Sequence, residues 1–134
     1  MKSRIQSLSL QQEENQSTQL KAVFNSQFQA FAKKPAIISV IFAEGIFHYD
    51  EKLSKEVAEI MDFMQEYVTK NITKGQKKGQ YSKMIDASTL ATIIIGGMRM
   101  TILKWKLSGY TSNLTKEGNM VLESTLKMFE TNKL

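Results

Sequence analysis

Residues 90–107 read LATIIIGGMRMTILKWKL, and this stretch decides the fold. Asp86 or Ser88 offers an N-cap before it and Gly109 offers a left-handed C-cap after it, so the sequence predicts one helix that ends at Ser108. Three successive isoleucines make this helix apolar on every side, whereas a peripheral helix of a small monomer is amphipathic. Another protein surface must therefore cover its second face.

Two further features of this region require close packing against other helices. Gly96 and Gly97 lie in the middle of the helix, where each costs about 1 kcal/mol relative to alanine, and close approach of a neighbouring helix offsets that cost. The last helix, expected from about Leu114, has a heptad-like apolar seam. The seam consists of Leu114, Gly118, Val121, Leu122, Thr125, Leu126 and Phe129.

Upstream, the sequence predicts two helices separated by a proline. Apolar residues at spacings of three and four between residues 20 and 31 place an aromatic stripe on one helix face. The lysine pair 33–34 closes that helix, and Pro35 begins the next one, which extends to about Phe47. The glutamine-rich segment 11–19 that comes before is predicted to be a turn or an exposed helical stretch.

A long third helix is expected after Asp50, which is a suitable N-cap. Its apolar face extends to Ile72, and Gly75 and Gly79 are expected to end it, which makes residues 75–83 a surface loop. Lysines gather here without a neighbouring acid, either as a phosphate-binding patch or as a solvated helix end, and the helix dipole favours the second interpretation. They are Lys70, Lys74, Lys77, Lys78 and Lys83.

Length and composition restrict the class of protein. A chain of 134 residues fits one domain, and the absence of cysteine excludes disulfides, thiolate metal sites and thiol catalysis. The N-terminus is not a signal peptide, and Arg99, Lys104 and Lys106 interrupt the most apolar stretch, so no membrane span is expected. These features predict a cytoplasmic protein.

Catalytic chemistry has little to build on. The one histidine is His48, and Glu44 stands four residues before it, which supplies two metal ligands where a stable site needs three or four. We therefore expect no enzyme activity, no metal and no cofactor. Glu44 lies among apolar neighbours and either orients a ligand or pairs with a basic side chain, and the pairing is favoured because buried charges are rarely unpaired.

Six phenylalanine and methionine side chains are expected on inward helix faces. Methionine adapts to varied shapes, so these residues can line a binding cavity, but the same spacing is equally typical of an ordinary core. Taken alone, the pattern favours a core. The residues are Phe24, Phe28, Phe42, Met61, Met64 and Met98.

The order of several weak motifs over more than 100 residues carries a resemblance to a known family. The motifs are the helix 20–31 with the following KPAIISVIFAE (34–44), the helix end ITKGQKKGQY (72–81), residues 86–91, WKLSG (105–109) and LTKEG (114–118). In this order they resemble the C-terminal ligand-binding and dimerisation domain of TetR-family (TetR/AcrR-type) transcriptional regulators.

The resemblance implies an all-α antiparallel bundle of five to six helices, the last two of which form a four-helix bundle with a second copy. It also implies an apolar ligand pocket bordered by the six inward residues, with Glu44 near its edge. The implied dimer interface consists of Ile94, Gly97, Thr101, Leu114, Gly118, Val121, Leu122, Thr125, Leu126 and Phe129.

One departure from the family concerns the N-terminus. Nothing before Leu20 resembles a helix-turn-helix, so residues 1–19 are expected to be the end of a connecting helix plus a polar linker, and residues 20–134 the domain itself. DNA is then bound only through a helix-turn-helix that these residues do not contain.

The sequence thus predicts the ligand-sensing and dimerisation domain of a TetR-type repressor, which binds a small apolar effector and a second copy of itself. The alternative is a stand-alone helical homodimeric interaction protein that binds neither ligand nor DNA. A third interpretation, a helical metalloenzyme built on Glu44 and His48, has the least support.

Overall fold

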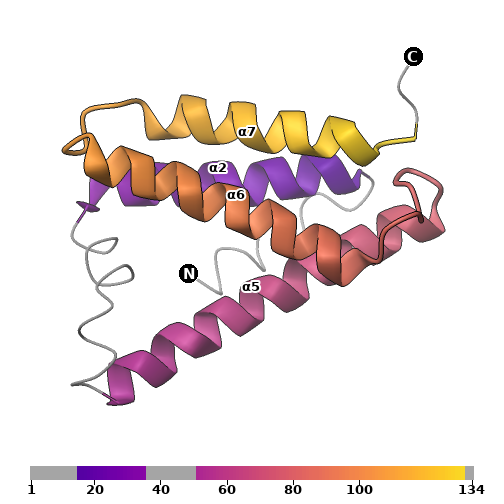
Figure 1. The fold of residues 1–134 in the computed structure, drawn as a ribbon, viewed down its shortest axis with the longest axis horizontal. Coiled ribbons are helices and arrows are strands. Elements are labelled where there is room, and N and C mark those ends of the chain that lie inside the picture. The colour runs from indigo at the N-terminus through magenta and orange to yellow at the C-terminus, as the bar shows by residue number, and fades with distance from the viewer. Residues whose placement is uncertain (1–14, 36–50, 132–134) are drawn as a thin grey trace.

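The computed structural model describes residues 15–35 and 51–131, and these segments are helical apart from their turns and one isolated bridge (Figure 1). The described helices are α2 (Gln16–Lys33), α5 (Glu51–Lys77), α6 (Ala87–Leu107) and α7 (Leu114–Phe129). The predicted all-α class is therefore confirmed. The helix expected between Pro35 and Phe47 lies outside the described residues, as does the Asp50 cap.

The helices form a bundle in which α2 is covered from several sides (Figure 1). Helix α7 runs antiparallel along α2, α6 packs against α7 and α5, and α5 crosses the bundle obliquely. The C-terminal half of α5 meets α2, whereas its N-terminal half diverges from α2. This divergence decides which α5 side chains are buried.

Side-chain caps fix where three of these helices begin. The Asn15, Asp86 and Asn113 side chains accept hydrogen bonds from the backbone N–H groups of Thr18, Thr89 and Lys116, respectively. The predicted Asp86 cap is confirmed, and the hydrogen bonds from the Thr89 side chain and backbone lower the pKa of its carboxyl.

The end of α6 also agrees with the sequence. Gly109 follows the C-cap Ser108 with φ +74, the left-handed conformation that was expected there. Tyr110 shares this conformation at φ 64, and its ring packs edge-on against Trp105 with a centroid distance of 4.9 Å. The aromatic contact holds the turn that leads into α7.

Helix α2 begins earlier than the sequence predicts, and its first turn is buried rather than exposed. Gln16, Ser17 and Gln19 are 1%, 5% and 7% exposed, although they belong to the segment interpreted as a turn or an exposed stretch. The error arose because polar side chains were assigned to solvent. Here they are buried with protein partners instead, as in the 2.8 Å bond from the Asn71 amide to the Gln19 oxygen.

The segment after α5 is likewise not the surface loop that was predicted. Gly75 lies inside α5, and it leaves room for the ring of Tyr81, which a Cβ at this position would overlap. Tyr81 is 1% exposed, packs edge-on against Phe129 at 4.9 Å, and its hydroxyl lies 2.8 Å from Ser17 Oγ. One side chain therefore joins the end of α5, the start of α2 and the end of α7.

The contact between α2 and α7 depends on Gly118. A Cβ at Gly118 would overlap three carbon atoms of the Phe28 ring, which is only 1% exposed and has no room to withdraw. We expect Gly118→Ala to lower the free energy of unfolding by about 1–3 kcal/mol, even though alanine favours a helix by about 1 kcal/mol. Urea denaturation measures this change.

The control for this prediction is Glu123→Ala on the same helix. Glu123 is exposed and forms a 3.9 Å ion pair with Lys127, so its loss should change the free energy of unfolding by only a few tenths of a kcal/mol. Equal stability of Gly118→Ala and the parent protein would contradict the packing described here.

Candidate functional site

Four of the predicted pocket residues lie together in the interior. Phe24, Phe28, Met64 and Met98 belong to one hydrophobic cluster formed by α2, α5, α6 and α7, and each is at most 8% exposed. The Phe24 and Phe28 ring centroids are 6.4 Å apart. Phe42 and Glu44, the other proposed members on the preceding helix, lie outside the described residues.

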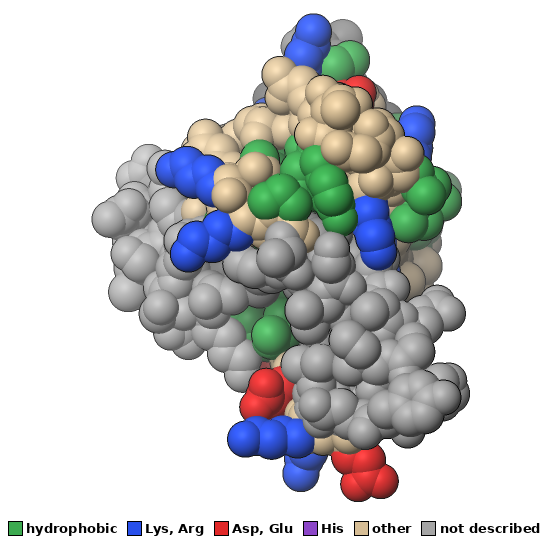
Figure 2. All heavy atoms as spheres, turned by 90° about the vertical axis from the view of Figure 1, so that its left-hand side faces the viewer, with side chains coloured by type: hydrophobic (Ala, Val, Ile, Leu, Met, Phe, Trp, Pro, Cys, Tyr) green, Lys and Arg blue, Asp and Glu red, His purple; other side chains and the backbone are tan. Residues whose placement is uncertain are grey.

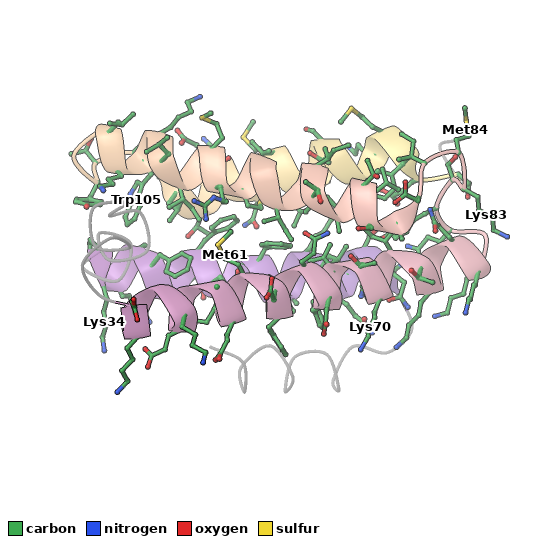
Figure 3. The ribbon with its side chains drawn as sticks, turned by 60° about the horizontal axis from the view of Figure 1, so that its bottom comes forward. Lys34, Met61, Lys70, Lys83, Met84 and Trp105 are labelled. Carbon is green, nitrogen blue, oxygen red and sulfur yellow. The ribbon has the colours of Figure 1, made fainter. Side chains whose placement is uncertain are left out.

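Met61 does not share this position. It is 44% exposed, and its sulfur lies 3.8 Å from Nη1 of Arg99 on α6 (Figure 3). The predicted inward orientation of Met61 is wrong because α5 has already diverged from α2 at this turn (Figure 1). The spacing of three to Met64 places both side chains on one helix face, but only the C-terminal part of that face is covered.

The predicted dimer interface is also corrected. Seven of its ten residues are buried in the chain's own interior, where α7 packs against α2 and α6 packs against α5 and α7. A side chain that is already buried within one subunit cannot provide the surface that meets a second. These residues are Ile94, Thr101, Leu114, Gly118, Leu122, Leu126 and Phe129.

An apolar surface nevertheless exists on α6 and α7, on neighbouring positions. We name it the α6–α7 strip, and its larger side chains are between 37% and 77% exposed. Gly96 adds a flat position, because a Cβ there would meet nothing within 4 Å, and a Cβ at Gly97 would lie 3.6 Å from Val121. The strip consists of Ile93, Gly96, Gly97, Met100, Leu107, Met120, Val121 and Met128.

The figures show how this surface is placed. Sulfur-bearing side chains project from the side of α6 and α7 that is turned away from α5 (Figure 3). At the end of the molecule where α6 leads into α7, hydrophobic side chains reach the surface between Lys and Arg side chains (Figure 2). Of the predicted interface residues, Gly97, Val121 and Thr125 remain at least partly exposed.

Buried polar side chains are a feature that the sequence analysis missed. Between α2 and α5, the Gln27 amide donates to the sulfur of Met64 at 3.3 Å, and Asn71 donates to Gln19 at 2.8 Å. The signal was present, since Gln16, Gln19 and Gln27 recur on one face of α2. Glutamine at those spacings was interpreted as solvent-facing, and only the three-dimensional contacts show otherwise.

Charge, by contrast, is kept at the surface. Lys70, Lys74, Lys77 and Lys83 are exposed, and Lys83 and Met84 project from the turn between α5 and α6 (Figure 3). The buried polar side chains among the described residues are all neutral amides and hydroxyls. The described interior is therefore an apolar cluster with neutral polar groups on the α2 side, and it contains no catalytic constellation of charged groups.

Comparison with known proteins identifies this architecture. The sequence model described as "Tetracyclin repressor-like, C-terminal domain" matches residues 46–117, which is more than half of the chain. This chain belongs to that family. The tetracyclin repressor-like C-terminal domain is a domain of transcriptional regulators rather than of enzymes, so the chain is assigned as a regulator's ligand-binding domain.

A solved structure shows the same fold. The chain is similar to the fatty acid degradation regulator FadR from Bacillus halodurans, with a TM-score of 0.77 and 17% sequence identity. The similarity covers 92% of this chain and 63% of FadR, so the tetracyclin repressor-like domain corresponds to part of a longer protein there. No curated protein sequence matches the chain significantly. In the described segments, no helix is long and apolar enough to span a membrane.

The Tyr81 contact leads to a prediction for alkaline pH. Burial raises the pKa of Tyr81 from 10.0 to about 12, against the opposing effect of the Ser17 hydrogen bond. Because the unfolded chain releases this proton at a lower pH than the folded chain, the contribution of Tyr81 to stability is complete below pH 10. That contribution is lost as the pH rises from 10 to about 12.

We expect Tyr81→Phe to lose about 0.5–1.5 kcal/mol of stability at neutral pH with the Ser17 bond. Between pH 10 and 12 its free energy of unfolding should fall less than that of the parent. Ser17→Ala is the control, because it removes the hydrogen bond and keeps the buried phenol. Denaturant titrations at each pH measure these slopes, and equal slopes for Tyr81→Phe and the parent would show that Tyr81 is not buried as described.

Proposed function

We propose that this chain is the effector-sensing and dimerisation domain of a TetR-type repressor, and that it binds a small apolar molecule. The α6–α7 strip is the observation that carries this proposal. It is an apolar surface on two adjacent helices of a domain whose other helices bury their apolar side chains internally. A second copy that packs its own strip against this one removes both surfaces from water.

The geometry of the strip fits such a contact. Ile93, Gly96, Met100 and Leu107 recur on α6 at spacings of three, four and seven, which places them on one face of the helix. Gly96 has no neighbouring atom in its own chain, so another helix backbone can approach it closely. A stable interface of this type buries more than ~1,000 Å² in total.

The proposed effector is apolar because the interior that would receive it is apolar. Phe24, Met64 and Met98 are buried in one cluster, and methionine side chains repack at low cost around ligands of different shape. The name of FadR refers to fatty acid degradation, which supports an apolar effector for a domain of the same fold. DNA binding and repression would belong to the whole regulator, through a helix-turn-helix.

A second candidate function is supported by a different observation. Phe28 packs directly on Gly118, and Met64 accepts a hydrogen bond from Gln27, so these two side chains are held as in a filled core. A domain with a filled core would act as a homodimeric interaction module without an effector. The two candidates share the strip and differ in how the interior responds to substitution.

The dimer is tested most sharply at Gly96. Arginine at this position meets nothing in the chain itself and is a better helix former than glycine, so Gly96→Arg should fold at least as stably as a subunit. In a dimer it would place a charged side chain in the apolar contact, and we expect a monomer at micromolar concentration. Size-exclusion chromatography with light scattering measures the mass of the species.

The matched control is Ala58→Arg, which adds the same charge at an exposed position of α5. It should leave the dimer intact. If Gly96→Arg and Ala58→Arg have the same mass as the parent, the strip is not the subunit interface.

The effector is tested at Met64. In a filled core, Met64→Ala should cost about 2–5 kcal/mol because it leaves a cavity. In the wall of an effector pocket it should cost less than about 2 kcal/mol and should change which alcohols of an octyl, decyl and dodecyl series raise the melting temperature. Met84→Ala is the control, since Met84 is 93% exposed and touches neither core nor pocket. A large loss in Met64→Ala, together with no stabilisation of the parent by any alcohol, would favour the interaction module.

A further inference from the structure

The buried polar groups at the start of α2 have more hydrogen-bond acceptors than donors. We call Gln16, Gln19 and Asn71 the amide cluster. Asn71 uses its N–H₂ group to donate to Gln19 Oε1 at 2.8 Å, and its own carbonyl oxygen has no partner. The carbonyl oxygen of Gln16 also has none, although the residue is 1% exposed.

Both carbonyls belong to the same part of the interior. Gln16 stands one helical turn before Gln19 on the face of α2 that meets α5, and Asn71 reaches that face from α5. The nearby donors already have partners. The Tyr81 hydroxyl is paired with Ser17, and the Gln80 amide donates to Asn15 and, more distantly, to Ser17.

An unpaired buried carbonyl is costly, and native proteins supply it with a partner. The partner must bring a donor, because both groups are acceptors. A carboxylate brings only acceptors, and the buried polar residues among the described segments include no cation to neutralise it. A protonated amine would lose its hydration without meeting a negative charge. A neutral hydroxyl or amide N–H meets both conditions.

We propose that the effector carries a neutral hydrogen-bond donor at one end, a hydroxyl or a carboxamide, which binds Asn71 Oδ1 and Gln16 Oε1. This inference rests on the proposed effector-sensing function and names the chemical class of the effector. Its apolar body lies along α2 and α5 towards Gln27 and Met64. Gln19 and Gln27 are eight residues apart, about 12 Å along the helix, which is a distance that a medium-length alkyl chain can span.

The experiment compares ligands of equal length that differ only in their polar end. Octanol and octanamide have a neutral donor, heptyl methyl ether has an oxygen without a donor, and octanoate is an anion at pH 7. Calorimetry and thermal melting of the whole chain measure binding. We expect octanol and octanamide to bind on the order of tenfold more tightly than the ether, and octanoate to bind more weakly than either of them.

Two variants locate the effect. Asn71→Leu should reduce the preference for octanol over the ether to nearly none. Gln16→Leu removes an acceptor that has no partner, so it should leave the stability of the unliganded protein unchanged or raised and still weaken octanol binding. Asn119→Leu is the matched control, because it also removes an amide–amide bond of 2.8 Å between helices, to Asn25 on the opposite side of α2, and should keep the preference.

The outcomes separate the two levels of the proposal. If the ether or octanoate binds as tightly as octanol, or if Asn71→Leu and Asn119→Leu behave alike, the donor-bearing effector is wrong while effector sensing stands. The same holds if only buried water serves the two carbonyls, because the ligands would then not be distinguished by their donors. If none of the compounds stabilises the parent protein, effector sensing and the donor-bearing effector are overturned together.

Discussion

The structure depends on one constraint, which is that α6 is apolar on more faces than a single subunit can cover. One side of the helix is buried against α5 and α7 through Leu90, Ile94 and Met98. The other side presents Ile93 and Met100 to the surface. Burial of the first side organises the bundle, and exposure of the second is the physical reason to propose a dimer.

The remaining helices are arranged around the inner side of α6 by a small number of close contacts. Glycine at position 118 lets α7 approach the Phe28 ring of α2, and glycine at position 75 makes room for Tyr81. These two contacts lie at different points along α2, so α2 is held along its length. The bundle thereby places Phe24, Met64 and Met98 in one interior, which is the region proposed to receive the effector.

Features determined by local chemistry could be predicted from the sequence. Asp86 and Gly109 mark the ends of α6 because capping depends on a few neighbouring residues, and the class of fold followed from the same punctuation. Long-range features could not. Gln16 and Tyr81 are buried by segments more than 60 residues away, and hydropathy alone assigns the first to solvent and the second to a surface loop. The interface prediction failed in register, since Ile93 is exposed and Ile94 is buried, a difference that depends on how α6 is rotated about its axis.

The most direct test of this account is the mass of the wild-type protein in solution at micromolar concentration, measured by sedimentation equilibrium. Coverage of the α6–α7 strip by a second copy predicts a species of twice the 15.3 kDa chain mass that persists on dilution through this range. A single species of 15.3 kDa would mean that the outer face of α6 remains exposed, which contradicts the central claim.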